Sequence, residues 1–218
     1  MYRERRIAGL EAVLWQSTAD GPGPGTILPD GCMDLVVTSG RVLVAGPDTR
    51  AVVVDRERGA TATGLRFDSG VLPALLGVPA RELTDLREPL EQVRPDLVPG
   101  EFDGTAGSLV RIAVRARAHA APDPVVREAA RLLRRGAPVR ETAGAIGYGE
   151  RQLRRMALQH FGYGPKTLSR IARFQRALAL AGTMPAADIA RDAGYADQAH
   201  LVRECTELTG TSFGALTR

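Results

Sequence analysis

Residues 143–156 read AGAIGYGERQLRRM, and residues 190–203 read ARDAGYADQAHLVR. Both stretches place small and apolar residues before a Gly-Tyr pair, which begins at Gly147 and at Gly194, and a run with a polar face after it. Glycine permits the left-handed backbone that a tight turn between two helices requires. Each stretch therefore predicts a helix-turn-helix, and the offset of 47 residues between the pairs (194 − 147) predicts a duplicated unit.

The two units end on glycines 48 residues apart, Gly162 and Gly210 (210 − 162). Because this offset is larger by one, we expect one additional residue inside the second recognition helix, the helix that follows the second turn. The units are predicted at about 139–162 and 185–210, with a bridging helix at about 165–182. Since such units insert their second helix into the DNA major groove, the duplication predicts a DNA-binding domain.

From roughly Asp123 onwards the chain resembles the DNA-binding domain of the AraC/XylS family of transcriptional regulators. The resemblance also rests on residues 161–165 (FGYGP), 173–177 (RFQRA) and 188–190 (DIA). It implies two helix-turn-helix units joined by one long helix, with double-stranded DNA as the partner. RNA polymerase, a small-molecule effector and a second copy of the chain are further candidate partners.

The N-terminal half resembles, more loosely, the sensor domains that precede this module in some regulators. The similar segments are residues 28–35 (LPDGCMDL), 45–49 (AGPDT), 64–67 (GLRF) and 76–79 (LGVP). This resemblance implies a cupin-like β domain followed by helices that often mediate dimerisation.

The pattern of the N-terminal half itself predicts short strands. Runs rich in Val, Leu and Thr lie at residues 11–18, 33–38, 41–45, 51–55 and 60–67, separated by turn signals that include a tight hairpin at Ser39-Gly40. Such close spacing favours a small antiparallel barrel or sandwich. The expected fold class is therefore α+β: a cupin-like barrel with flanking helices, then an all-α domain of two helix-turn-helix units.

Domain limits follow from the same patterns. A β-rich sensor, effector or dimerisation domain is predicted at 1–118, a Pro-containing linker at 119–124 and the DNA-binding domain at 125–218, where Asp123 caps a helix that begins at Pro124. A short helix is expected at 71–76 and a longer one at 104–117. The longer helix carries an apolar stripe with Leu109 and Ile112, which either covers the β domain or forms a two-fold dimer contact.

The formal net charge of +4 is unevenly distributed. Residues 1–121 carry 14 basic against 16 acidic residues, giving −2, whereas residues 131–176 carry 11 against 2, giving +9. This positive block coincides with the first unit and the bridging helix, as expected for a surface that meets DNA. Residues 177–218 carry 3 against 5, giving −2, and because Glu204 and Glu207 repel phosphate we expect the second unit to contribute less affinity.

Candidate DNA contacts lie on the polar faces of the two recognition helices. Arginine can bind guanine through two hydrogen bonds, and glutamine can bind adenine in the same way. The candidates are Arg151, Gln152, Arg154 and Arg155 in the first helix (150–161), and Gln198, His200 and Arg203 in the second. The alternatives are phosphate contacts or a solvated face, a packing role for His200, and a structural tie between helices for Arg203.

An effector site is a weaker prediction. If the barrel binds a small molecule, its mouth would be lined by Trp15, Asp30, Asp34, Asp48 and Arg66. The alternative places Trp15 in the core and assigns the aspartates to capping backbone groups in turns.

The sequence offers no constellation for catalysis or metal binding. The N-terminal domain has a single histidine, His119, at its far edge, whereas a metal-binding cupin needs several ligands, so we expect no metal, no cofactor and no enzyme activity. The rival interpretation is a small-molecule-binding protein or enzyme whose helical half only packs on the β half. Cys32 is either an inert small apolar residue or a redox sensor, and no disulfide with Cys205 is expected. The absence of an apolar N-terminal or membrane-spanning run favours a cytoplasmic protein.

Overall fold

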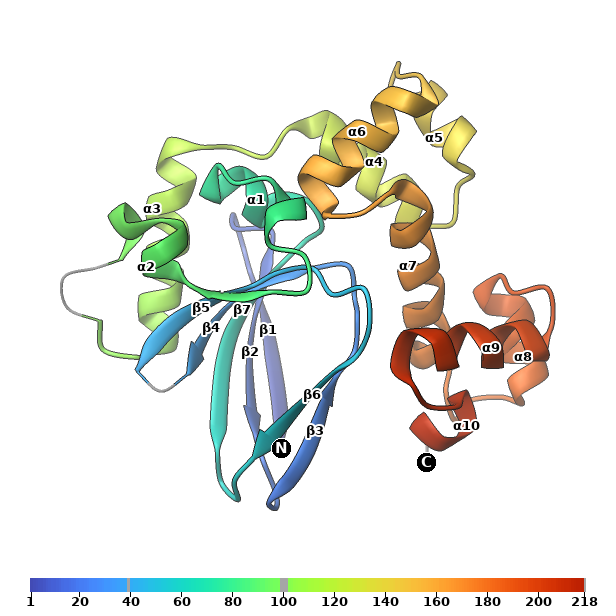
Figure 1. The fold of residues 1–218 in the computed structure, drawn as a ribbon, viewed down its shortest axis with the longest axis horizontal. Coiled ribbons are helices and arrows are strands. Elements are labelled where there is room, and N and C mark those ends of the chain that lie inside the picture. Colours follow the sequence, from blue (N-terminus) through green and yellow to red (C-terminus); the bar gives the residue numbers. More distant parts are fainter. Residues whose placement is uncertain (39, 99–101, 218) are drawn as a thin grey trace.

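The computed structural model describes residues 1–38, 40–98 and 102–217, and it consists of a β-rich N-terminal half followed by a helical C-terminal half (Figure 1). The main sheet has six strands in the order β1-β2-β7-β4-β5-β8, all antiparallel to their neighbours. These strands are β1 (Tyr2–Ile7), β2 (Ala12–Thr18), β4 (Met33–Thr38), β5 (Arg41–Ala45), β7 (Thr61–Phe67) and β8 (Arg87–Pro89). The remaining strands, β3 (Gly23–Ile27) and β6 (Val52–Arg56), form a separate antiparallel ribbon.

The expected α+β fold class is confirmed, but the barrel expected for the N-terminal half is not closed. In the described residues β1 and β8 are the free edges of the main sheet, and β3 and β6 pair only with each other. The ribbon lies beside the C-terminal helices (Figure 1), and Ala51, just before β6, donates its N–H to the Leu208 carbonyl at 2.7 Å. The N-terminal domain is therefore an open sheet with a two-stranded flap.

One face of the main sheet is covered by helices. The covering elements are α1 (Val71–Leu76), α2 (Leu90–Val93), α3 (Ala106–His119) and two 3₁₀ turns, η1 (Ala80–Glu82) and η2 (Pro95–Leu97). Strand alternation places Leu35, Leu65 and Phe67 in this core. Leu109 and Ile112 of α3, which are 0% and 2% exposed, belong to the same core. The stripe on α3 thus covers the β domain, and its buried side chains are not available for a dimer contact.

A second core holds the C-terminal half together. Its helices are α4 (Pro124–Arg134), α5 (Val139–Ala145), α6 (Glu150–Phe161), α7 (Pro165–Ala179), α8 (Ala186–Ala193), α9 (Gln198–Thr209) and α10 (Phe213–Leu216). As expected, the Asp123 carboxylate caps α4, accepting the Val125 N–H at 2.8 Å. Both helix-turn-helix units are present, α5–α6 and α8–α9, and α7 joins them (Figure 1). The bridging helix ends at Ala179 rather than near residue 182.

The additional residue of the second unit lies in its turn, not in its recognition helix. Helices α6 and α9 have 12 residues each. Helix α6 begins three positions after Gly147 (150 − 147), whereas α9 begins four after Gly194 (198 − 194). Both glycines have a positive φ, 72° and 91°, as a tight turn requires. The longer turn includes Asp197, whose carboxylate caps α9 by accepting the His200 N–H at 2.6 Å.

The hairpin between β4 and β5 is present, since Thr38 pairs with Arg41. Ser39 lies outside the described residues, as does Arg218 at the end of the predicted DNA-binding domain. Among the described helices, none has the length and apolarity needed to cross a membrane.

Candidate DNA-binding surface and interdomain contacts

The first recognition helix, α6, presents a free arginine face. Leu153, Ala157 and Phe161 are buried on its inner side, and Arg151, Arg154 and Arg155 are exposed. Within the described part of the chain, the side chains of these three arginines make no hydrogen bond or ion pair. Their guanidinium groups are therefore available to phosphates or base edges.

Gln152 has a structural role that the sequence analysis missed. Its Oε1 accepts the Gly149 N–H at 2.8 Å and so caps the start of α6. Recognition of adenine through two hydrogen bonds needs both the oxygen and the nitrogen of the amide. In this arrangement one lone pair of the oxygen is already engaged, whereas the amide nitrogen is free. The sequence signal for this cap was the position of Gln152, three residues after Gly149 at the start of the helix.

The second recognition helix, α9, offers fewer free groups. Gln198 and Arg203 are exposed and make no hydrogen bond or ion pair within the described residues. His200 is held locally: its Nδ1 accepts the Ala196 N–H at 3.4 Å, and its ring meets Tyr195 edge-on with 5.1 Å between centroids. The structure thus gives His200 a packing position, whereas Arg203 does not tie α9 to its neighbours.

The tie between α9 and the bridging helix is made by other residues. Arg173 contacts Glu204 at 2.7 Å and lies 4.7 Å above the Tyr195 ring, and Arg170 pairs with both Glu204 and Glu207. The two carboxylates on which we based weaker DNA affinity are therefore neutralised by α7 within the domain. That reason for a weaker second unit does not hold, although its exposed cations remain fewer than those of α6.

Four of the five predicted effector residues lie near one another on the side of the main sheet that faces away from α1 and α3. The Trp15 Nε1–H donates to Asp34 Oδ1 at 2.6 Å. The Arg66 guanidinium lies 3.6 Å from Asp30 Oδ2 and also pairs with Glu4 at 3.2 Å. Burial and, to a smaller extent, the neighbouring Asp30 carboxylate together raise the pKa of Asp34 to about 7.

Asp48 is engaged elsewhere. It is 8% exposed, and its two oxygens accept from the Arg87 guanidinium at 2.6 and 2.7 Å, which holds the loop after β5 to β8. Asp30 has the capping role considered for it, because its carboxylate accepts the Cys32 N–H at 2.9 Å.

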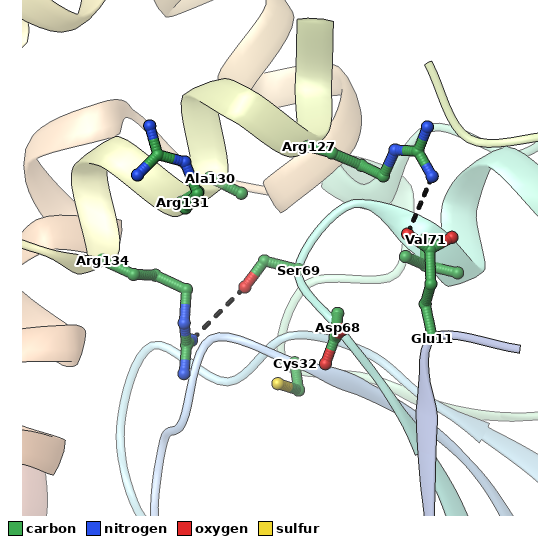
Figure 2. A pocket seen from close by; sticks show the side chains of 9 residues that line it. All are labelled: Glu11, Cys32, Asp68, Ser69, Val71, Arg127, Ala130, Arg131 and Arg134. Atoms are coloured by element: carbon green, nitrogen blue, oxygen red, sulfur yellow. Dashed lines mark hydrogen bonds and ion pairs between the residues drawn. The ribbon is translucent and has the colours of Figure 1, made fainter. Parts of the chain in front are cut away.

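A pocket of about 270 Å³ lies between the two halves (Figure 2). From the N-terminal side it is lined by Glu11, Cys32, Asp68, Ser69 and Val71, and from α4 by Arg127, Ala130, Arg131 and Arg134. Figure 2 shows Arg127 reaching Glu11, at 2.9 Å, and Arg134 reaching Ser69, at 3.4 Å. Burial raises the pKa of the Cys32 thiol well above its usual range, so this cysteine is a poor nucleophile.

Glycines allow the two halves to approach closely at three points. A Cβ atom on Gly162, at the end of α6, would lie 2.5 Å from Thr84 Oγ1 and 2.6 Å from Pro47 Cγ. A Cβ on Gly70 would lie 2.7 Å from a Val126 methyl group, and one on Gly31 would lie 2.9 Å from a Leu168 methyl group. The first recognition helix is therefore docked against the N-terminal half at its C-terminal end.

Comparison with known proteins gives two family matches and a common fold. Residues 142–218 match a helix-turn-helix domain family (HTH_18), and residues 8–89 match a domain family of unknown function (DUF6597). No match was found among curated protein sequences.

The solved structures similar to this chain include crystal structures of ToxT from Vibrio cholerae. An apo variant and a 1.65 Å structure each have 10% sequence identity and a TM-score of 0.50, and each covers 99% of this chain, with 98% and 97% of the ToxT chain covered. A ToxT structure with an unsaturated fatty acid bound has 10% identity and a TM-score of 0.46, covering 95% of both chains. The whole chain, not only its C-terminal half, thus shares the ToxT fold.

Proposed function

We propose that this chain, which belongs to the AraC family of helix-turn-helix proteins, is a sequence-specific DNA-binding transcription regulator. In this proposal residues 125–218 bind double-stranded DNA, residues 119–124 are a linker, and residues 1–118 sense a small molecule or a partner. RNA polymerase and a second copy of the chain are further partners in the same proposal. Because the stripe on α3 is buried, a dimer would have to use another surface.

The observation that carries the proposal is the arginine face of α6. Three guanidinium groups project from one recognition helix, and no carboxylate within the described residues pairs with them. On an ordinary protein surface such a cluster repels itself, and phosphates would relieve that repulsion. We assign base or backbone contacts to Arg151, Arg154 and Arg155, with Gln152 contributing through its amide nitrogen. Gln198 and Arg203 contribute from α9, and His200 takes a supporting position.

Selection from fragmented genomic DNA tests the proposal. Fragments retained by the full-length protein are sequenced, and the same selection is run with Arg154 and Arg155 both replaced by alanine. We expect the wild type to enrich a common sequence motif and the variant to lose it. Retention of fragments without any shared motif, by a folded wild-type protein, would contradict sequence-specific binding.

A further inference from the structure

We propose that two loops of the N-terminal half, residues 46–51 and 83–87, hold the C-terminal ends of both recognition helices and thereby set the spacing of the two DNA segments that the chain accepts. We call this pair of loops the brace. The proposal rests on the proposed function and specifies its DNA site further. The distance between the two recognition helices can be measured without DNA, so the two proposals can fail separately.

The brace contacts both recognition helices at corresponding positions. At the end of α6, Thr84 Oγ1 donates to the Gly162 carbonyl at 3.2 Å, and a Cβ atom on Gly162 would lie 2.6 Å from Pro47 Cγ. At the end of α9, the Leu208 carbonyl accepts the Ala51 N–H at 2.7 Å. Pro47 and Ala51 belong to the same loop, which joins β5 to β6. One short loop therefore contacts both helix-turn-helix units.

The two loops of the brace are locked to each other. Both oxygens of Asp48 accept from the Arg87 guanidinium, at 2.6 and 2.7 Å, and Asp48 is 8% exposed. Thr49 donates its N–H and its hydroxyl to the Asp85 carboxylate at 2.7 and 2.8 Å, and the Asp85 N–H donates to the Pro47 carbonyl at 3.2 Å. Paired bonds to charged groups fix geometry as well as adding energy. The contacts at Gly162 and Leu208 therefore start from one rigid support.

The position of the brace leaves the DNA-contacting surface open. A helix-turn-helix unit contacts base edges with the N-terminal residues of its recognition helix. Arg151 and Arg154 lie in the first half of α6 and Gln198 is the first residue of α9, and all three are exposed. The brace is at the opposite end of each helix. It therefore positions the recognition helices and does not block them.

A fixed distance between two recognition helices selects the spacing of the DNA segments that they contact. Each base pair added between the segments moves the second one by about 3.4 Å and rotates it by about 35° around the duplex. Helix α7 already joins the units, and Arg173 ties it to α9. The brace adds a second link, from the other half of the chain. Two links restrict the relative motion of the units more than one does, so fewer spacings allow both units to bind at once.

A variant at Ala51 tests the contact with α9. Ala51→Pro removes the N–H that Leu208 accepts, and proline is tolerated at the start of a strand because the pairing of β6 begins at the next residue. Ala51→Gly keeps this N–H and is the matched control. Affinity is measured for the selected duplex and for duplexes with one base pair inserted or deleted between the two contacted segments, which footprinting locates. We expect the change to weaken binding more than about tenfold for the wild type and Ala51→Gly, and less than about threefold for Ala51→Pro.

A second variant loosens the brace itself. Asp85 is exposed and has a φ of 59°, so Asp85→Gly removes the carboxylate that holds Thr49 without straining the backbone. The exposed Glu82 lies just outside the brace, and Glu82→Gln controls for the loss of a carboxylate that repels phosphate. We expect Asp85→Gly to tolerate altered spacing as Ala51→Pro does, and Glu82→Gln to discriminate as the wild type does.

The distance between the recognition helices gives a measurement that does not need DNA. Spin labels are attached to cysteines placed at the exposed Gln159 of α6 and Thr206 of α9, in the full-length protein with Cys32 and Cys205 replaced by alanine. Pulsed electron paramagnetic resonance then gives the distribution of distances between the labels. We expect a narrow distribution when the brace is intact and a clearly broader one with Ala51→Pro.

Broader distances together with relaxed spacing would support the proposal. Unchanged distances in both Ala51→Pro and Asp85→Gly, unchanged discrimination between spacings in both, or a wild type that binds all spacings equally would overturn it. If the wild type binds no DNA, the proposed function fails and the claim about spacing fails with it, whereas the distances still show whether the brace holds the two helices.

Discussion

Arg154 and Arg155 are adjacent residues whose side chains have no partner within the described structure. Substituting them therefore tests DNA binding without breaking an interaction inside the protein. Replacing either with alanine should cost on the order of 1–3 kcal/mol of DNA-binding free energy if it contacts a base. Gln198→Ala should cost less, because α9 offers fewer free groups. Competition binding with a selected duplex and its single-base variants measures both quantities, and the reverse ranking would show that the second unit dominates recognition.

The raised pKa of Asp34 should make the free energy of unfolding depend on pH. Its folded pKa of about 7 lies above the ordinary value of 3.8, so the fold favours the protonated carboxyl. The stabilisation from this group is full below about pH 4 and is lost as the pH rises through 7. Relative to Asp34→Asn, the wild type should lose on the order of 1 kcal/mol between pH 5 and pH 8. Urea unfolding of both proteins at the two pH values is the measurement, and parallel pH profiles would exclude the raised pKa.

The sequence predicted which residues of α6 are exposed, but it did not predict which hydrogen bonds and ion pairs the side chains of the two recognition helices make. Helical periodicity was enough to separate Leu153 from Arg154, because burial follows the 3.6-residue repeat. The cap made by Gln152 and the pairing of Glu204 with Arg173 depend on side-chain positions, and the latter joins residues 31 positions apart. A sequence pattern alone does not show such long-range partners. Whether the predicted residues contact DNA stays a prediction.

Helix α3 has both buried and exposed apolar residues, and these should differ in their effect on stability. Since Leu109 is fully buried beneath the sheet, Leu109→Ala should destabilise the protein by about 2–5 kcal/mol. Val114 on the same helix is 54% exposed, and Val114→Ala should change stability by less than about 0.5 kcal/mol. Chemical denaturation measures both variants. A small effect of Leu109→Ala, accompanied by loss of a dimer in light scattering, would restore the dimer interpretation.

Elements with a one-sided apolar pattern were predictable, and those without one were not. The predicted bounds are correct for two strands and one helix, at 33–38, 41–45 and 150–161. In each of them the apolar residues recur with the period of the strand or helix, because one side packs on a core. Strand β1 (YRERRI) is an exposed edge, and β3 (GPGTI) belongs to the flap, so neither carries a core-facing signal. Barrel closure also could not be predicted, since it depends on which edges pair and not on how many strands exist.

The close contact between α6 and the N-terminal half depends on Gly162. Gly210 is its counterpart at the end of α9, and both have a positive φ, 83° and 71°. An alanine at either position carries a similar backbone strain, of about 1–2 kcal/mol. Only at Gly162 would the added Cβ collide with the other half, because Gly210 has nothing within 4 Å.

Gly162→Ala should therefore loosen the contact between the halves, and Gly210→Ala should not. We expect faster hydrogen exchange near Thr84 and Arg134 and a larger radius of gyration in Gly162→Ala alone. Equal behaviour of the two variants would mean that the contact tolerates displacement, and that it does not constrain the first recognition helix.

If the chain binds DNA through the arginine face of α6, its affinity for DNA must depend on salt concentration. For a duplex obtained by selection, the logarithm of the binding constant should fall steeply and linearly with the logarithm of salt concentration, by about 0.9 for each phosphate neutralised. Replacing Arg151, Arg154 and Arg155 together with alanine should make this slope shallower by about 2–3. A flat dependence in the wild type, or the same slope in the folded triple variant, would show that these three arginines do not bind DNA phosphates.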